Sequence, residues 1–598
     1  MAKYPLSEDH LDSHFLKKWG MWFDWGTLWI GSILLLWQAW LQGQWPGTGV
    51  DLYGTVWFYG WIYHSLTQWF DPSFTEWFFF PNGKDIFAHT GNNFVDAYLS
   101  IPFQMVFKDW YPAPFVTSLL LMNVWCFRWW VEELGALKWV QCWMGWLWLL
   151  NPFCLSELAM GRPTQLLLFP SMVALIFFMR LEDGDRKAWW WLGLFVAFQG
   201  WCYWFYGFFL AMVMGGLLFL RIINGKSTPV YLFDLLKAGI LCAVLIAPAV
   251  GPMLQTVDSN VGLGTVDTSS LLSIRQTMVP WIRGVQLFEP IGHPMFFSWL
   301  YGSMLLGVLW SIRKGGRWLV VALGMSVVAL GPFQTIGDTE LLNYPYLFLV
   351  KLIPFFERLW FPYRAIGFVM MLVLVQLALL AKEWRGSLRI KGMLVGGSVM
   401  LGGWDLYRVG SLPLVHTEMP KSSVSDCIDA PTIQLPIGFV HPTMVWQVEH
   451  QQPYFGGMGE NGLLFLPQGY KARLQNPWVQ FLRSASLWRE TTKRYSPFDK
   501  QRILDLGFRY VLWDRSMTEQ ERLRYSKEEG RPTEIFLMQQ TLIEHLGYPV
   551  CHDGAWLLFD IQSPLDTLEQ PLDGWDWQPP TLSNYEIRLR EMGRVPKQ

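Results

Sequence analysis

Asp51 combines a reactive side chain with a setting that could make use of it. It lies in the segment GTGVDLYGTVW, where glycine and threonine precede an aromatic run, shortly after the first long apolar stretch. A carboxylate near a membrane surface could act as a general base that takes a proton from an attacking hydroxyl. It could also accept hydrogen bonds from the free N–H groups at the start of an amphipathic helix. The residues alone leave both interpretations open.

Glu157 and Arg162 are a second candidate pair, in the segment SELAMGRPTQ near the outer end of another apolar stretch. Ionisable residues at membrane depth are candidates for function, and these two could form a structural ion pair or share an outer pocket. Arg358 and Arg364 lie in FFERLWFPYRAIG. Arginine can hold a phosphate through two parallel hydrogen bonds, but arginines at an outer interface can equally bind lipid headgroups or backbone carbonyls.

A turn-rich polar segment, FFFPNGKDIFAHTGNNF at residues 78–94, interrupts two aromatic runs. It contains Asp85, His89 and Asn92. PNG is a turn signal, and the flanking runs VDLYGTVWFYGWIYHSLTQWF and NNFVDAYLSIPFQMVF have the amphipathic aromatic pattern of helices that lie in the membrane interface. We therefore expect a hairpin between two interfacial helices on the outer face.

Other chemistry-bearing residues favour structural roles. Asp24 follows a pair of lysines closely, so we expect its side chain to reach the cytoplasmic face. His89, His293 and His441 do not share the spacing of metal ligands, and we predict no metal site built from protein side chains alone.

Most of the seven cysteines lie in or beside apolar stretches, without metal-ligand spacing, and are expected to be small buried hydrophobic residues. Cys427 and Cys551 lie in the C-terminal part of the chain, which we place outside the membrane. They could form a disulfide in an oxidising compartment, although the sequence cannot fix the connectivity.

The elements that position these residues are mostly membrane-spanning helices. The chain is 52% hydrophobic and 16% charged, with 38 Trp and a formal net charge of -2. Without a long basic cluster, this composition excludes a nucleic-acid-binding protein. About eleven apolar stretches approach the roughly 20 residues that cross a bilayer as a helix, at 20–43, 112–132, 137–154, 163–180, 187–204, 205–221, 234–254, 296–312, 317–333, 363–381 and 390–407.

The cations of the short loops orient these stretches. With the N-terminus inside, the inner loops hold most of them, as the positive-inside rule requires: Lys138; Arg180, Arg186 and Lys187; Arg221 and Lys226; Arg313, Lys314 and Arg317; Lys382, Arg385, Arg389 and Lys391. One long helix over 187–221 would disrupt this pattern, whereas two helices preserve it. We predict a cytoplasmic N-terminus, an uncleaved first span and an external segment after residue 407.

The chain therefore divides into a transmembrane domain at residues 1–407 and a periplasmic domain at 408–598. The first external loop, 44–111, contains the interfacial helices, and the segments 255–295 and 334–362 are also long enough to be functional. In the tail, the strand-like segments TIQLPI (432–437), RYVLWD (509–514) and AWLLFDI (555–561) alternate with helical ones. This alternation predicts a small α/β domain.

The order of these segments resembles that of bacterial members of the GT-C superfamily, polytopic membrane glycosyltransferases that use sugars linked to lipid phosphates. The resemblance covers most of the chain and rests on motifs that are weak singly but occur in a shared order: VDLYGTVWFYGWIYHSL, FFFPNGKDIFAHTGNN, VDTSSLLSIRQTMVPW with GHP, FERLWFPYRAIG, IQLPI, WQVEHQQPYFGG and LGFRYVLWD.

The resemblance implies an inverting glycosyl transfer at the outer face of the bacterial inner membrane, from a polyprenyl-phosphate-linked sugar to an acceptor. Asp51 then serves as base on the acceptor hydroxyl, and Arg or His groups steady the departing phosphate. The remaining site residues are expected around one outer cavity: Asp85, His89, Asn92, Glu157, Arg162, Asp267, His293, Arg358 and Arg364. Leu52 follows Asp51, so the two-carboxylate signature of better-known members is absent, and the use of a divalent cation is left open.

Two other classes of protein are alternatives. A non-catalytic GT-C-fold subunit would use its Trp- and Phe-rich faces to bind membrane lipids and other membrane subunits, and its polar residues need not converge. A transporter is expected to show polar breaks at mid-membrane and often inverted halves, whereas this sequence shows few mid-span charges and no repeat. The convergence of the candidate residues therefore separates an enzyme from a membrane subunit.

Overall fold

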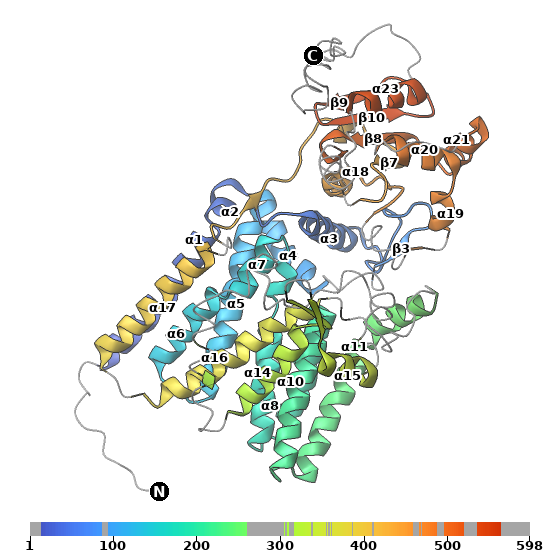
Figure 1. The fold of residues 1–598 in the computed structure, drawn as a ribbon. Coiled ribbons are helices and arrows are strands. Elements are labelled where there is room, and N and C mark those ends of the chain that lie inside the picture. Colours follow the sequence, from blue (N-terminus) through green and yellow to red (C-terminus); the bar gives the residue numbers. More distant parts are fainter. Residues whose placement is uncertain are drawn as a thin grey trace, which may run out of the picture. The chain divides into compact units, whose positions relative to one another are not determined.

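The structure is a computed structural model that describes residues 13–86, 94–259, 304, 308–309, 316–336, 339–353, 356, 359, 361–384, 387–408, 412–439, 441–457, 466–467, 469–486, 495–518 and 535–563 (Figure 1). The chain forms two compact units. The first comprises Met1–Pro72 with Ile86–Met419, and the second Ser73–Asp85 with Pro420–Gln598. The units therefore divide at places other than the expected boundary after residue 407.

Long helices dominate the first unit and occupy the predicted apolar stretches, apart from 296–312, which lies mostly outside the described residues. They are α1 (Ser13–Leu35), α5 (Pro112–Glu133), α6 (Lys138–Leu149), α8 (Phe169–Glu182), α9 (Ala188–Cys202), α10 (Trp204–Ile223), α11 (Pro229–Ser259), α14 (Arg317–Ala329), α16 (Ile366–Lys382) and α17 (Leu388–Arg408). In the described part of the chain, four segments are long and apolar enough to cross a membrane: Pro163–Glu182, Trp204–Ile223, Pro229–Gly251 and Pro362–Lys382. The total of about eleven spans stays a prediction.

The stretch 187–221 forms two helices, as the loop charges predict. Tyr203 separates α9 from α10 because its backbone is extended, with φ -164° and ψ 119°. The chain can fold back closely here, since a Cβ on Gly207 would lie 2.9 Å from Gly200 Cα. Side chains at these glycines would force the two helices apart.

The first external segment begins with α2 (Trp37–Gln42), β1 (Trp45–Pro46) and α3 (Val50–Gln68), and continues after the polar turn with α4 (Phe94–Phe107) and η1 (Lys108–Trp110). The strand β1 pairs with β6 (His416–Thr417), which keeps residues 416–417 in the first unit. Further along the unit lie β4 (Phe333–Ile336), β5 (Thr339–Leu342) and α15 (Tyr344–Leu352).

The α3 helix differs from the predicted interfacial helix because most of it is buried. Trp57 and Tyr59 are fully buried, and the rings of Trp57 and Trp61 stack at 5.8 Å. The α4 helix keeps an exposed apolar end, with Met105 and Val106 more than half exposed. Aromatic runs occur both in interfacial belts and in cores, so their position depends on the packing.

Asp24 on α1 forms an ion pair within the first unit, and the expected reach of its side chain to the cytoplasmic face stays a prediction. Its Oδ2 lies 2.5 Å from Arg128 Nη2 on α5. The Arg128 guanidinium also lies over the Trp25 ring, 4.6 Å from its centre. Pairing offsets the high cost of taking either charge out of water. Each helix can therefore bury its charged residue because the other helix supplies the counter-ion.

The second unit contains a four-stranded sheet in the order β7-β8-β10-β9. Its strands are β7 (Thr432–Leu435), β8 (Tyr510–Asp514), β9 (Cys551–Asp553) and β10 (Trp556–Asp560), with β7 parallel to β8 and the other pairs antiparallel. The helices are α18 (Gln447–His450), α19 (Tyr470–Leu474), α20 (Pro477–Ala485), α21 (Pro497–Leu504) and α23 (Ile535–Leu546). The three predicted strand segments and the α/β character are confirmed in this unit.

Residues 73–85 belong to the second unit, although they lie far from the rest of it in sequence. They form the hairpin β2 (Phe74–Thr75) and β3 (Lys84–Asp85), with the predicted turn at Pro81–Gly83. The N–H of Phe80 donates to Tyr454 O at 3.1 Å, and the N–H of Tyr454 donates to Trp77 O at 2.8 Å. The polar turn is thus anchored by backbone hydrogen bonds to the C-terminal part of the chain.

Cys427 and Cys551 form a disulfide with a Cα–Cα distance of 6.6 Å. It joins the turn η7 (Ser425–Cys427) to β9. The other cysteines are free and are buried or half-buried: Cys126, Cys142, Cys154, Cys202 and Cys242.

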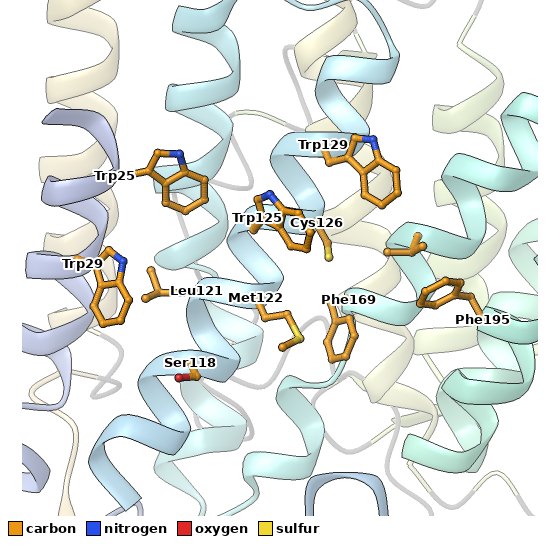
Figure 2. Close-up of a pocket in the computed structure, with 11 residues that line it drawn as sticks. Trp25, Trp29, Ser118, Leu121, Met122, Trp125, Cys126, Trp129, Phe169 and Phe195 are labelled. Atoms are coloured by element: carbon orange, nitrogen blue, oxygen red, sulfur yellow. The ribbon is translucent and has the colours of Figure 1, made fainter. Parts of the chain in front are cut away.

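An apolar pocket of about 490 Å³ lies among α1, α5, α8 and α9 (Figure 2). Four tryptophans, Trp25, Trp29, Trp125 and Trp129, form much of its lining, together with Phe169. The pocket includes none of the predicted site residues, so the polar candidates must be sought elsewhere in the unit.

Candidate functional site

Glu157 is carried by a short helix that begins where the predicted span 137–154 is interrupted. After α6 ends at Leu149, Asn151 caps α7 (Pro152–Ala159) by accepting hydrogen bonds from the N–H groups of Phe153 at 2.9 Å and Cys154 at 3.5 Å. Pro152 suits the first helical position, where no N–H partner is needed. This new start places Glu157 inside the protein, with no exposed surface.

Glycines bring the start of α3 against the chain that follows α7. Gly47 and Gly161 have positive φ angles of 99° and 73°. A Cβ on Gly47 would lie 2.2 Å from Leu158 O, and one on Gly161 would lie 2.4 Å from Leu52 Cβ. Larger residues cannot fit at either position without moving the backbone, so these glycines allow Asp51 to approach Arg162.

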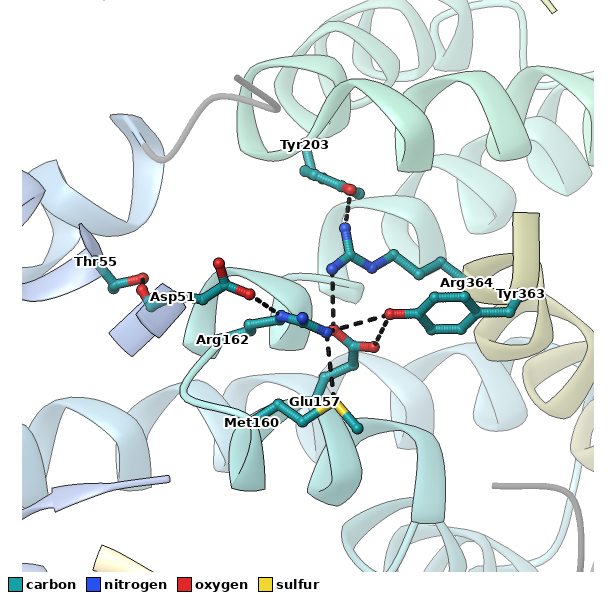
Figure 3. Close-up of polar contacts among 8 residues, drawn as sticks. All are labelled: Asp51, Thr55, Glu157, Met160, Arg162, Tyr203, Tyr363 and Arg364. Atoms are coloured by element: carbon teal, nitrogen blue, oxygen red, sulfur yellow. Dashed lines mark hydrogen bonds and ion pairs between the residues drawn. The ribbon is translucent and has the colours of Figure 1, made fainter. Parts of the chain in front are cut away.

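Asp51 lies in the first turn of α3 and pairs with Arg162 (Figure 3). Arg162 Nε donates to Asp51 Oδ2 at 2.6 Å. Gly49, and not Asp51, occupies the N-cap position of the helix. The Asp51 carboxylate therefore forms the ion pair and does not cap the helix. The Asp51 side chain remains 51% exposed, which leaves it accessible to a ligand.

Glu157 accepts hydrogen bonds from three neighbouring side chains. Arg162 Nη1 and Arg364 Nη2 approach its Oε2 at 3.4 and 3.3 Å, and the Tyr363 hydroxyl donates to Oε1 at 2.9 Å (Figure 3). Each oxygen of this buried carboxylate therefore has a donor, which is the condition for burying a charge at acceptable cost.

Arg364 closes the inner side of the cluster from the turn η6 (Pro362–Ala365), just before α16. It is 4% exposed, and its Nη1 donates to the Tyr203 hydroxyl. The Phe361 ring lies 4.5 Å from the guanidinium carbon. These contacts fix the Arg364 side chain through an ion pair, a hydrogen bond and a cation–π contact.

The cluster of Asp51, Glu157, Arg162 and Arg364 is charge-balanced, with two carboxylates and two guanidinium groups. Exposure falls from the Asp51 side chain at 51%, through Arg162 at 22%, to Arg364 at 5% and Glu157 at 0%. A ligand can therefore approach from the side of Asp51 and Arg162, while Glu157 and Arg364 hold Arg162 from behind.

The structure brings together only some of the predicted site residues. Asp51, Glu157, Arg162 and Arg364 form the cluster, as expected for a convergent site. Asp85 lies in β3 of the second unit, where it pairs with Phe74 in the backbone register. Five predicted residues lie outside the described part of the chain: His89, Asn92, Asp267, His293 and Arg358.

Two tyrosines of the cluster were not predicted. Tyr363 donates to Glu157 and accepts from Arg162 Nη1 at 3.2 Å. Its position beside Arg364 in FPYRAIG was an available signal. Tyr203 lies in the run GWCYWFYGFF, where nothing in the local sequence distinguishes it from its aromatic neighbours.

A second polar group was also missed, around the fully buried Asp96 of α4. Asp96 Oδ2 accepts from the Tyr59 hydroxyl at 2.6 Å and from Thr164 Oγ1 at 2.5 Å. Tyr59 lies on α3 with Asp51, and Thr164 follows Arg162 by two residues in η2 (Pro163–Leu166). Burial raises the pKa of Asp96 to about 7. Asp96 therefore joins the two elements that carry the Asp51–Arg162 pair.

Comparisons with known proteins identify the fold. No protein-family model matches the chain, and no curated protein sequence matches it. Among solved structures, the arabinofuranosyltransferase AftD from mycobacteria aligns with 99% of this chain at 12% identity and a TM-score of 0.51. This chain covers 44% of AftD, less than half of its length.

A second similar structure is the archaeal oligosaccharyltransferase AglB from Archaeoglobus fulgidus, solved with an inhibitory peptide and a dolichol-phosphate. It aligns with 93% of this chain and 75% of its own, at 12% identity and a TM-score of 0.50. A structure of an oligosaccharyltransferase from Archaeoglobus fulgidus, tethered to an acceptor peptide, covers 86% of this chain and 70% of its own, at 11% identity and a TM-score of 0.51. The likeness at this identity concerns the fold alone, and the chain shares the fold of these membrane glycosyltransferases.

Proposed function

We propose that the protein is a membrane glycosyltransferase that moves a sugar from a lipid-phosphate donor to an acceptor hydroxyl at the outer face of the bacterial inner membrane. The observation that carries this proposal is the convergence of Asp51, Glu157, Arg162 and Arg364 in one cluster, on a fold shared with glycosyltransferases. A subunit with only a structural role predicts no such convergence of the candidate residues.

Asp51 supplies the base in the proposed reaction. Its carboxylate takes the proton of the acceptor hydroxyl, whose oxygen then forms a bond to the anomeric carbon of the sugar. The bond between that carbon and the phosphate oxygen breaks on the opposite side, so the configuration inverts. The half-exposed position of Asp51 supports this role, because the acceptor must come within hydrogen-bond reach.

The phosphate that departs carries away the electron pair of the broken bond and gains negative charge. Arg162 lies beside Asp51 and is partly exposed, so its guanidinium group can hydrogen-bond that phosphate. Arg364 lies deeper and bonds to Glu157, which in turn holds Arg162. Arg364 and Glu157 therefore position the phosphate-binding arginine. Asp85, His89, Asn92, Asp267, His293 and Arg358 remain proposed contributors to sugar or phosphate binding.

The test is a glycosyl-transfer assay of the purified full-length protein in liposomes, with a panel of polyprenyl-phosphate sugars. We expect Asp51→Asn to lower turnover by about 100-fold or more, the usual contribution of a general base. Asp109→Asn is the matched control, because Asp109 is an exposed residue of the same external segment. A folded wild-type protein that turns over no donor would instead support the non-catalytic membrane subunit.

A further inference from the structure

We propose that Arg162 is the resident cation of this site, so that its guanidinium group takes the place of a divalent metal ion between Asp51 and Glu157. The part of the proposal that concerns catalysis rests on the proposed glycosyl transfer. The part that concerns metal binding rests on the geometry alone and can be tested without any substrate.

Two carboxylates near a phosphate-binding site are a common donor set for Mg²⁺ or Mn²⁺. Here the Arg162 side chain already bridges them, with Nε 2.6 Å from Asp51 Oδ2 and Nη1 3.4 Å from Glu157 Oε2. One planar group therefore neutralises both carboxylates from opposite ends of its fork. A metal ion that bound the same two oxygens would have to displace it.

Both carboxylate oxygens of Glu157 also have other hydrogen-bond donors, so neither is free for a metal ion. Oε1 accepts from the Tyr363 hydroxyl at 2.9 Å, and Oε2 also faces Arg364 Nη2 at 3.3 Å. Magnesium demands near-octahedral oxygen ligands at about 2.0–2.1 Å. Among the described residues, no group of three or more His, Cys, Asp and Glu side chains is placed to hold a metal ion. The donor set does not fit a divalent cation.

The net charge of the cluster also argues against a bound divalent cation. The two carboxylates and two guanidinium groups sum to zero, and Glu157 and Arg364 are buried. A divalent ion added beside both arginines would leave a net charge of about +2 in a partly buried site, which is costly without further anions. Burial lowers the pKa of Arg162, but the Glu157 and Asp51 carboxylates raise it by more, so the guanidinium stays charged.

The local backbone keeps Arg162 in this position. Gly161, with its φ of 73°, packs against Leu52 beside Asp51. On the other side, Arg162 Nη1 lies 3.3 Å from Met160 Sδ and 3.2 Å from the Tyr363 hydroxyl. These contacts hold the Arg162 side chain in the site, and the exposed side of its guanidinium group can hydrogen-bond a phosphate directly.

Mn²⁺ binding to the full-length protein, followed by electron paramagnetic resonance in detergent, tests the proposal with the metal alone. Wild type is expected to bind no Mn²⁺ at this site. Arg162→Ala should gain affinity by about tenfold or more, and the added substitution Glu157→Gln should abolish the gain. Arg186→Ala is the matched control, because it also removes an arginine from a buried carboxylate, Asp234, which keeps its second partner Lys237 as Glu157 keeps Arg364. Arg162→Gln repeats the test if the alanine variant does not fold.

Three outcomes of the Mn²⁺ measurement overturn the proposal. They are one equivalent of Mn²⁺ bound by wild type and lost in Asp51→Asn, the same gain in Arg186→Ala as in Arg162→Ala, or no gain in either folded Arg162 variant. Where the transfer assay shows turnover, wild type should retain it in a chelator, and a strict metal requirement also overturns the proposal. Failure of the transfer assay alone contradicts the proposed function but leaves the Mn²⁺ result decisive.

Discussion

Arg162 Nε lies 2.6 Å from Asp51 Oδ2, across 111 residues of sequence. The two residues come from different elements, the first turn of α3 and the loop after α7, and the close approach at Gly47 and Gly161 helps to bring them together. The position of Arg162 depends in turn on the buried Glu157 behind it. Substitutions of Arg162, of Gly161 and of the residues that support them should therefore differ in their effects on activity and on stability.

Arg162→Lys should lower glycosyl transfer by about 100-fold, comparable to the loss of one well-placed donor to developing charge. Lysine keeps the positive charge, but its single ammonium group cannot bridge Asp51 and Glu157 as the planar guanidinium does. The measurement is kcat and KM with the donor that wild type uses. Arg186→Lys is the control and should leave both constants unchanged. Equal activity of Arg162→Lys and wild type would show that charge alone is sufficient.

Gly161→Ala should destabilise the first unit and reduce activity together. The residue has a φ of 73°, and a Cβ would lie 2.4 Å from Leu52 Cβ. The backbone strain and the overlap each cost about 1–3 kcal/mol. Gly184→Ala is a matched control, because Gly184 has a φ of 97° but nothing within 4 Å of a Cβ. Thermal unfolding in detergent should show a clearly larger loss for Gly161→Ala. Equal losses at the two positions would mean that only the backbone angle matters.

The rarity of charge in this chain made part of the site predictable. Glu157, Arg162 and Arg364 stand out because few ionisable residues occur at membrane depth, where each needs a partner. The Asp51–Arg162 contact was not predictable, because it depends on a backbone approach between distant segments. The sequence therefore left Asp51 open between a helix cap and a base; the structure shows that it pairs with Arg162 and that Gly49 is the N-cap residue, and its role as a base stays a proposal.

The aromatic segments show a different limit. The run from Val50 to Gln68 predicts a helix correctly, but its aromatic residues suit both a membrane interface and a packed core. The structure buries most of α3. The turn at Pro81–Gly83 was likewise predictable from its residues, but it connects the strands β2 and β3 and not the two helices that we expected. The backbone hydrogen bonds of this β-hairpin to Tyr454 join segments with no shared local signal.

Stability should fall as the pH rises from about 4 to about 7, through the buried carboxyl of Asp96. Its pKa is raised from 3.8 to about 7 by burial, so the folded state keeps a proton that the unfolded state releases above its ordinary pKa. The free energy of unfolding then decreases with pH in this window, by at most about 1.4 kcal/mol per pH unit. The contribution is fully present below the ordinary pKa and is lost as the pH passes the raised one.

Asp96→Asn should remove this pH dependence, because the amide cannot titrate but its oxygen can still accept from Tyr59 and Thr164. Thermal unfolding of the full-length protein at several pH values between about 4 and about 8 measures the slope. Asp109→Asn, at an exposed position, should keep the wild-type slope. A slope that survives in Asp96→Asn would assign the titration to another group.

Reduction of the Cys427–Cys551 disulfide should destabilise the second unit, because the bond closes a loop of 124 residues. The chain-entropy estimate for a loop of this length is about 4–5 kcal/mol. The Cys427→Ser/Cys551→Ser variant should unfold at a lower temperature than wild type and should not respond to a reductant. Cys242→Ser, at a free cysteine, should behave as wild type. No effect of a reductant on oxidised wild type would contradict this role of the bond.

Asp24 and Arg128 should stabilise the helix bundle as a pair, and either residue should destabilise it when its partner is removed. Their side chains are only 14% and 9% exposed, so Asp24→Asn leaves the Arg128 guanidinium buried beside the Trp25 ring without its counter-ion. Breaking a buried pair in this way costs about 3–5 kcal/mol, whereas replacing both partners by apolar residues is often neutral. Asp24→Leu with Arg128→Met should therefore recover most of the stability lost in Asp24→Asn. The measurement is thermal unfolding in detergent of wild type, Asp24→Asn and the double variant. A double variant less stable than Asp24→Asn would mean that packing at these positions, and not the unpaired charge, dominates the stability.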